Sequence, residues 1–236
     1  MKMFWLMLKD LQLNKKKLVN DNFVIEKINE IVFDNVTFSY EGVENPIFKD
    51  LNLKLPKQKH IIITGDNGSG KSTLLGLASG IYFANNGLVS SFSNKFGYVS
   101  AQPYIFKDSL RSNLVYGSEK KNVLDSDLLS LLTKFKVFKS QSENDLNRQI
   151  TNKSLSSGQM QKIGFIRAII SQPDVILLDE STSNLDYNSK LIVFKILKEQ
   201  KITIINSTHD PENFDFADLH IKINVVDGQR KVSIDS

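Results

Sequence analysis

Residues 65–72 of this chain read Gly65-Asp66-Asn67-Gly68-Ser69-Gly70-Lys71-Ser72. The octet matches in full the pattern of a glycine, four variable residues, then Gly-Lys and a hydroxyl residue. The run His60–Thr64 before it is short, apolar and β-branched, which predicts a buried parallel strand. Good helix formers follow over 72–78, so the predicted order is strand, glycine-rich loop, helix. This order is typical of a site for the phosphates of a nucleoside triphosphate.

The residue types in this loop explain how it would hold phosphates. Glycines let successive backbone N–H groups converge on phosphate oxygens, and the helix N-terminus adds the positive end of its dipole. Lys71 can reach the β and γ phosphates as a mobile point charge, and the Ser72 hydroxyl suits Mg²⁺. The predicted nucleotide-binding residues of the loop are Gly65, Asp66, Asn67, Gly68, Ser69, Gly70, Lys71, Ser72 and Thr73. The alternative is a chance glycine turn before a helix, and the loop alone leaves the reaction open, since many chemistries share it.

The rest of the chain alternates between strand-like and helix-like patterns. Apolar residues alternate with polar ones over 31–38 and 51–55, which predicts antiparallel strands. Further strands are predicted at Phe96–Ser100, Val175–Asp179 and Ile202–Asn206. Helices are predicted at Val123–Phe138, Gly158–Ser171 and Ser189–Gln200. Strands that alternate with helices indicate an α/β fold around a mostly parallel sheet.

Two carboxylates stand at the end of one predicted buried strand. Val175–Asp179 is apolar up to Asp179, and Glu180 follows directly. Open α/β sheets bind their ligands at the carboxyl ends of the strands, so these acids are candidates for the site. The alternative is a strand that ends in a solvated acidic turn.

Residues 155–159 read Leu155-Ser156-Ser157-Gly158-Gln159 and begin 84 positions after Lys71, just before a predicted helix. On these residues alone, a serine N-cap before an amphipathic helix is an adequate explanation. Together with the loop and the acidic strand end, the stretch resembles the LSGGQ signature of ABC ATPases. Ser157 stands where that family most often has glycine.

The resemblance implies a role for each polar group near the strand ends. Asp179 would hold Mg²⁺, usually through water, and Glu180 would orient or deprotonate the attacking water. Asp186, in a segment similar to the family's D-loop, would line an interface between two subunits. His209 occupies the place of the family's switch histidine, just past the strand 202–206. The other two histidines, His60 and His220, are predicted to be structural.

Two further residues complete the predicted site. Gln102 resembles the Q-loop glutamine, which contacts Mg²⁺ and the attacking water. Tyr40 resembles the aromatic residue that stacks on adenine, where a flat apolar face suits a flat base. Each could instead be a routine strand residue. The predicted catalytic residues are thus Lys71, Gln102, Glu180 and His209, the predicted metal ligands are Ser72, Gln102 and Asp179, and the other predicted nucleotide contacts are Tyr40, Ser156, Ser157, Gly158, Gln159 and Asp186.

The resemblance runs from Ile31 to Val226 and implies a fold and a domain organisation. The implied fold is an α/β P-loop NTPase with a mostly parallel core sheet, an antiparallel β subdomain and an α-helical subdomain that carries the signature, about residues 103–171. Residues 31–236 are the predicted ABC ATPase domain. Residues 1–30 are predicted to be a linker from a membrane domain, with a helix over 4–18 or a solvated terminus as the two alternatives.

One segment favours the exporter branch of the family. Residues 102–114 look like the exporter pattern in which an aromatic residue and a short helix follow the glutamine, and 179–183 are similar to the exporter form. Three features depart from that pattern: the short spacing of 31 positions between Lys71 and Gln102, the missing acidic loop at 148–154, and Ser157.

Composition excludes several classes of partner and of chemical site. The 236 residues carry 30 Lys plus Arg against 26 Asp plus Glu, an excess too small to argue for nucleic acid as a partner. The absence of cysteine excludes disulfides, thiolate metal sites and Cys nucleophiles, and three histidines make a His-rich metal site improbable. No run near the start is long enough for a membrane span or built like a signal peptide, so the chain is expected in the cytoplasm, at the inner face of a membrane through a partner.

The expected ligands and partners follow from the resemblance. They are ATP with Mg²⁺, a transmembrane domain, and a second cassette in a nucleotide-dependent homo- or heterodimer that powers export. Two alternatives stay open: a soluble ABC ATPase that acts on DNA or ribosomes, and a regulatory cassette that binds ATP without turnover. The 84 positions from Lys71 to Leu155 leave no room for the long coiled coils of chromosome-maintenance types.

Overall fold

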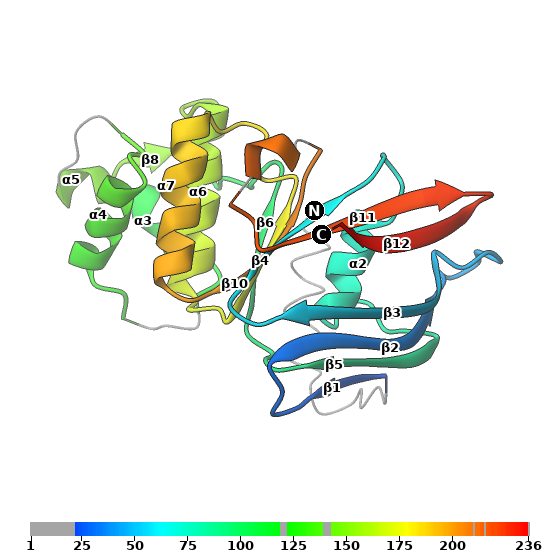
Figure 1. Ribbon diagram of the computed structural model, residues 1–236. Helices are drawn as coiled ribbons and strands as arrows, with labels where there is room; N and C mark the ends of the chain where they lie inside the picture. Colours follow the sequence, from blue (N-terminus) through cyan, green and yellow to red (C-terminus); the bar gives the residue numbers. More distant parts are fainter. Residues whose placement is uncertain (1–21, 119–121, 139–142, 210, 215, 236) are drawn as a thin grey trace. The chain divides into compact units, whose positions relative to one another are not determined.

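The computed structural model describes residues 22–235, apart from 119–121, 139–142, 210 and 215 (Figure 1). The described chain forms two compact units. The first unit comprises residues 22–57, 67–94 and 223–232, and the second comprises 58–66, 95–222 and 233–235. The predicted helix over residues 4–18 lies outside the described residues.

The first unit is built on a four-stranded sheet. Its strands are β1 (Phe23–Ile25), β2 (Glu30–Phe38), β3 (Phe48–Pro56) and β5 (Asn86–Ser91), in the order β1-β5-β2-β3. β2 is antiparallel to β3 and β5, whereas β1 is parallel to β5. The unit also contains helix α2 (Lys71–Ala78). The predicted antiparallel strands are therefore confirmed, but the sheet begins before the domain boundary predicted at residue 31, because β1 pairs with β5.

An irregularity in β2 explains its hydrophobic pattern. Ile31 and Phe33 alternate as expected, but the next buried residue is Val36, three positions later. The pairing of β2 with β3 shifts register between Phe33 and Val36, and Asn35 has a positive φ of 49°. A bulge of this kind returns the apolar side chains to the buried face of the sheet.

The second unit is built on a parallel sheet. Its strands are β4 (His60–Thr64), β6 (Phe96–Ser100), β9 (Val175–Asp179), β10 (Thr203–Ser207) and the first half of β11 (Leu219–Val226), in the order β11-β4-β10-β9-β6. All the pairings of these strands are parallel. Three of them begin and end at the predicted residues, and β10 begins one residue later than predicted.

Helices make up most of the rest of the second unit. They are α3 (Leu110–Val115), α4 (Asp125–Lys134), α5 (Glu143–Leu146), α6 (Ser157–Ile170), α7 (Tyr187–Glu199) and the 3₁₀ helix η1 (Pro211–Phe214), with a small sheet of β7 (Asp108–Ser109) and β8 (Gln149–Ile150). Helix α4 is shorter than the predicted 123–138. Within the described residues, no helix has the length and apolar character needed to cross a bilayer.

The hydrophobic core of the second unit explains how its helices are held. One buried cluster contains Ile62 and Leu178 of the sheet together with Leu110 of α3, Leu128 of α4 and Ile163 of α6. Because this apolar cluster is continuous, residues 103–171 belong to the same compact unit as the parallel sheet. Helices α3 to α6 lie in this predicted helical subdomain, and its bounds, about residues 103–171, stay a prediction.

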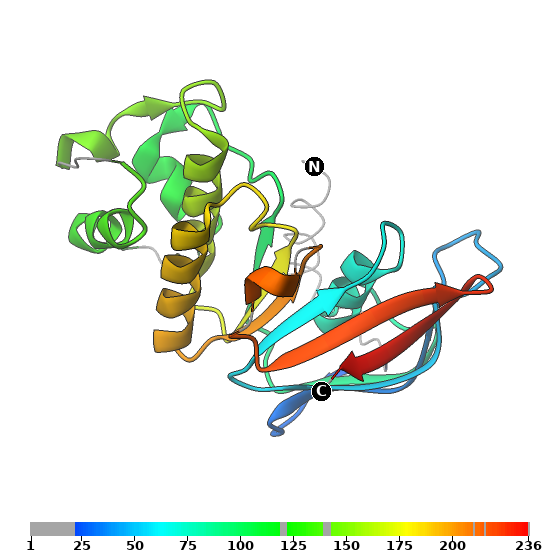
Figure 2. The same cartoon turned by 45° about the horizontal axis from the view of Figure 1, so that its top comes forward.

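A tight hairpin joins β11 to the last strand, β12 (Gln229–Asp235) (Figure 2). Asp227 and Gly228 lie between the strands with φ values of 51° and 74°. An Asp-Gly pair with positive φ at both positions is typical of a two-residue hairpin turn.

Candidate functional site

The glycine-rich loop connects β4, which ends at Thr64, to α2, which begins at Lys71. Gly70 caps the helix with a φ of 106°, and a Cβ there would lie 3.0 Å from the ring of Phe48 and 3.2 Å from Ile47. Gly68 also has a positive φ, 78°, but a Cβ there would meet nothing within 4 Å. Both glycines thus hold a backbone conformation that other residues adopt at a cost, and space is open beside Gly68.

Two observations in the first unit fit a bound phosphate. The N-cap of α2 is Gly70, a residue without a side chain that could cap the helix. The Ser69 hydroxyl is buried and has no hydrogen-bond partner among the described residues. A buried polar atom without a partner costs free energy unless a ligand or water satisfies it. The loop therefore offers donors where the sequence predicts phosphate oxygens.

Two side chains surround the loop residues within the same unit. The Tyr40 hydroxyl lies 2.8 Å from the Thr73 hydroxyl, and Tyr40 keeps 38% of its surface exposed. Arg230, on β12, donates from its guanidinium to the carbonyl of Gly68 at 3.4 Å. Sequence reasoning predicted Tyr40 and Thr73 but missed Arg230, which lies 162 positions from its partner.

In the second unit, the carboxylate of Asp179 is held at both oxygens. The hydroxyl of Tyr98, on β6, donates to Oδ2 at 3.0 Å, and the hydroxyl of Ser207, on β10, donates to Oδ1 at 2.9 Å. β6 and β10 are the two strands that flank β9, and Ser207 lies in register with Asp179. Two charge-assisted hydrogen bonds therefore fix the orientation of this carboxylate.

Glu180 follows Asp179 in an unusual backbone conformation. Its φ is 52°, a region that non-glycine residues rarely occupy and that costs free energy unless the surroundings enforce it. Its N–H donates to the carbonyl and the hydroxyl of Ser207, at 3.1 and 3.2 Å. The bonds from Ser207 thus support both consecutive acids.

The side chain of Glu180 pairs with His209. His209 Nε2 lies 2.6 Å from Glu180 Oε1. An ionised carboxylate can only accept a hydrogen bond, so Nε2 is the donor in this pair. The side chains are 39% and 42% exposed, so water can reach them. The structure brings together two of the four predicted catalytic residues within one compact unit.

The segment that carries Gln102 is anchored just before it. The carbonyl of Ala101 accepts hydrogen bonds from the side-chain amides of Gln161, on α6, and Asn184, the latter at 3.4 Å. Gln102 itself is exposed. Two amides from other parts of the unit therefore fix the course of the chain at this point.

Asp186 has a local role that the structure makes clear. It is the N-cap of α7, and its carboxylate accepts from the N–H and the hydroxyl of Ser189, each at 2.9 Å. These bonds lower the pKa of Asp186, because they favour the charged form of its carboxylate. Its predicted position at an interface between subunits stays a prediction.

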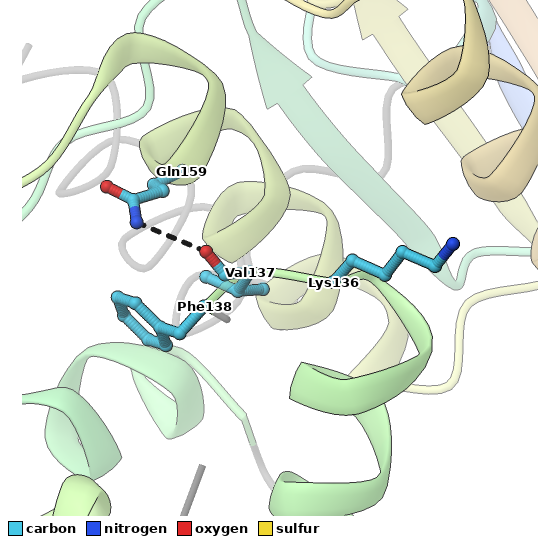
Figure 3. A pocket seen from close by; sticks show the side chains of 4 residues that line it. All are labelled: Lys136, Val137, Phe138 and Gln159. Atoms are coloured by element: carbon cyan, nitrogen blue, oxygen red, sulfur yellow. Dashed lines mark hydrogen bonds between the residues drawn. The ribbon is translucent and has the colours of Figure 1, made fainter. Parts of the chain in front are cut away.

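The signature residues open helix α6 with a complete capping box. The Ser156 hydroxyl accepts from the N–H of Gln159 at 3.2 Å, and Gln159 Oε1 accepts from the N–H of Ser156 at 2.9 Å. The amide nitrogen of Gln159 donates to the carbonyl of Val137 at 3.1 Å, beside a pocket lined by residues 136–138 and Gln159 (Figure 3). Both polar ends of the Gln159 side chain are thus used within the unit, whereas Ser156 and Ser157 are exposed at the helix start.

The predicted metal ligands have the chemistry that Mg²⁺ requires. Ser72 offers a hydroxyl, Gln102 an amide carbonyl and Asp179 a carboxylate, which are all hard oxygen donors. Across the described part of the chain, no group of three or more His, Cys, Asp or Glu side chains could hold a metal ion. A single carboxylate suits Mg²⁺ bound together with a nucleotide, because this ion usually takes few protein ligands and completes its shell with phosphates and water.

Sequence comparisons reveal extensive similarity to known proteins. The family model for ABC transporters matches residues 48–183. The chain is 33% identical over 195 residues to "ABC transporter B family member 18" of Arabidopsis thaliana, an alignment that covers 76% of this chain and 16% of the plant protein. It is 31% identical over 183 residues to the "ATP-dependent lipid A-core flippase" of Wigglesworthia glossinidia brevipalpis, which covers 71% of this chain and 32% of the flippase. The chain thus spans at most about a third of the length of these two relatives.

A solved structure has a similar fold. The "Structure of a bacterial Atm1-family ABC exporter with ATP bound" superposes with a TM-score of 0.74 over 96% of this chain and 43% of that one. The sequence identity is 19%, so this likeness concerns the fold alone.

Proposed function

Because the family model matches more than half of its residues, the chain belongs to the ABC transporter family, and we propose that it is the cassette that binds and hydrolyses ATP to power a transporter. The observation that carries the proposal is the arrangement at the end of β9. There Asp179 is held by Tyr98 and Ser207, and Glu180 is held by His209. Carboxylates that hydrogen bonds hold in a fixed orientation at the carboxyl end of a parallel strand suit phosphoryl transfer, because that reaction depends mainly on positioning and electrostatics.

In the proposed reaction the glycine-rich loop binds the nucleotide. Backbone N–H groups of residues 65–72 and the ammonium of Lys71 would hold the β and γ phosphates, while Tyr40 would stack on adenine. Ser72, Gln102 and Asp179 would hold Mg²⁺. When bound, this ion supplies positive charge that neutralises the phosphate oxygens.

Glu180 and His209 are proposed to handle the attacking water. The oxygen of the attacking water forms a bond to the γ-phosphorus, and Glu180 accepts a proton from that water. At the same time the bond between the γ-phosphorus and the bridging oxygen, which stays with ADP, breaks. The products are ADP and inorganic phosphate. The hydrogen bond from His209 Nε2 orients the Glu180 carboxylate for this step, and the strained backbone of Glu180 is consistent with a residue held in place for function.

The partners are proposed from the family and from the names of the relatives. Two cassettes would close on two ATP molecules, with Ser156, Ser157 and Gly158 of one copy completing the site of the other at a helix N-terminus. The exposure of Ser156 and Ser157 supports this role. A transmembrane domain would bind the cassette at the inner face of the membrane. The relatives are named as transporters and a flippase, which supports export and does not favour a soluble ATPase that acts on DNA or ribosomes.

The decisive experiment is ATPase activity of the wild-type chain and of Glu180→Gln. The variant keeps the size of the side chain but cannot take up the proton, so we expect activity to fall by more than about 100-fold. Glu199→Gln, an exposed acid at the end of α7, is the matched control and should hydrolyse ATP like the wild type. A wild-type chain that binds ATP but never turns it over, even with its membrane domain, would instead identify a regulatory cassette.

A further inference from the structure

The side chain of Tyr40 is held from two directions within the first unit. At its tip, the hydroxyl lies 2.8 Å from the hydroxyl of Thr73 on α2. Along its body, the ring lies 5.1 Å from the ring of Phe38 and 5.6 Å from that of Tyr82, both nearly perpendicular to it. A tyrosine side chain turns about only two torsions, so these contacts fix the orientation of the ring.

The ring nevertheless remains accessible. Tyr40 exposes 38% of its surface, whereas Phe38 exposes 5%. Tyr82 also packs closely against the first helix after the loop, because a Cβ on Gly76 would lie 2.3 Å from its ring. The aromatic group therefore presents a surface to solvent while its neighbours form a rigid support.

Thr73 is placed to act on this ring. It is the third residue of α2, directly after Lys71 and Ser72, and it exposes only 6% of its surface. A buried hydroxyl needs a hydrogen-bond partner, and here that partner is the hydroxyl of Tyr40. The helix that starts at the phosphate loop is thereby linked directly to the aromatic ring.

We infer that Thr73 is a positioning residue for the base of the nucleotide: its hydroxyl fixes the Tyr40 ring in the orientation in which the ring stacks on adenine. The inference rests on the proposed function, in which Tyr40 stacks on the base. It changes the role of Thr73, which the sequence predicts as a phosphate contact. A ring that is ordered before the ligand arrives loses less side-chain freedom on binding, so the bond between Thr73 and Tyr40 raises affinity for the base end of the ligand alone.

The test compares two ligands that share phosphates but not a base. Binding of ATP and of inorganic tripolyphosphate is measured calorimetrically for the wild-type chain, Thr73→Val, Tyr40→Phe and the double variant. Each single variant removes one hydroxyl and keeps the shape of the side chain. We expect each to weaken ATP binding by about 3- to 10-fold, and the double variant to be no weaker than either single one, because one shared bond is lost in all three. Tripolyphosphate should bind all four proteins equally.

Thr73→Ser provides the conservative comparison: because it keeps the hydroxyl, it should recover most of the ATP affinity that Thr73→Val loses. If Thr73→Val unfolds, Tyr40→Phe and Thr73→Ser still test the same bond. Equal losses for ATP and tripolyphosphate in Thr73→Val would overturn the inference and return Thr73 to the phosphates, and so would additive losses in the double variant. A wild-type chain that does not bind ATP would overturn the proposed function itself, together with the inference.

Discussion

Two histidines lie at opposite ends of the same parallel sheet, in different surroundings. His209 follows the end of β10, is 42% exposed and bonds to Glu180. His60 opens β4, is 6% exposed, and its ring stacks 4.5 Å from the ring of Phe194. Burial lowers the pKa of His60 to about 4, although the nearby charge of Asp218 opposes the shift. The comparison shows that the histidine at the carboxyl end of its strand is open to water and bonded to an acid, whereas the one at the start of its strand is packed among aromatic rings.

The largest effect should come from removing the histidine at the ligand end. We expect His209→Ala to lower ATPase activity by about 100-fold, because Glu180 loses the donor that orients it. The matched variant His60→Leu should keep the activity of the wild type at neutral pH. Similar losses in both variants would break the distinction between the two ends of the sheet.

The second effect concerns stability and is expected from His60 alone. Its pKa in the folded chain, about 4, lies below the ordinary value of 6.5, so the unfolded chain binds the proton more readily between these values. Above pH 6.5 the buried neutral His60 costs the fold nothing through protonation. As the pH falls from 6.5 toward 4, the unfolded chain takes up the proton and the free energy of unfolding decreases. At pH 5 the wild type should therefore lose roughly 2 kcal/mol of unfolding free energy that His60→Leu does not lose. Urea unfolding at pH 7.5 and pH 5 measures this difference, and equal pH dependence in the two proteins would refute it.

A smaller loss of activity should distinguish Ser207 from Ser100, the two serines that lie in register with Asp179 on the flanking strands. Ser207 donates to its Oδ1, so Ser207→Ala should lower kcat/KM for Mg²⁺-ATP by about 10-fold. Ser100 on β6 is also in register with Asp179, but within the described part of the chain its hydroxyl does not bond to that carboxylate, so Ser100→Ala should have little effect on kcat/KM. The same loss in both would mean that strand position, and not the hydroxyl bond, is what matters.

The smallest effect, a loss of stability, is expected when the carboxylate of Asp186 is removed from the start of α7. Asp186 caps α7, so Asp186→Ala should lower the unfolding free energy by about 1 kcal/mol. Asp186→Asn keeps an acceptor for the N–H of Ser189 and should lose much less. Thermal unfolding of the two variants provides the measurement, and an alanine variant as stable as the asparagine one would contradict the capping role.

Much of the fold could be predicted from the sequence, because the buried strands carry continuous apolar runs. β4, β6 and β9 have the predicted bounds, and the loop and helix after β4 follow in the predicted order. The bulge in β2 and the early strand β1 were not predicted, since they depend on pairing with strands far along the chain.

The site could be predicted only in part, for a related reason. Motif spacing identifies Asp179, Glu180 and His209, which the structure holds at one end of the sheet. Tyr98 and Ser207 were not predicted, because their hydroxyls can bond to Asp179 only when β6 and β10 lie beside β9. For Ser207, its place directly after the predicted strand 202–206 was the available signal, whereas Tyr98 lies in the middle of β6 and gave none. The sequence predicted Gln159 only as a nucleotide contact, whereas the structure gives its side chain a place in a capping box and a bond to the carbonyl of Val137; the contact stays a prediction.

A mixing experiment tests most directly our proposal that ATP is bound between the loop of one copy and the signature of another. Lys71→Ala removes the phosphate cation, and Ser156→Arg blocks the exposed start of α6; each variant alone should be inactive as an ATPase. Each mixed dimer would contain one intact site, built from the loop of the Ser156→Arg chain and the signature of the Lys71→Ala chain. We predict that mixing the two folded variants restores ATPase activity. A mixture as inactive as its components would contradict a shared site between two copies.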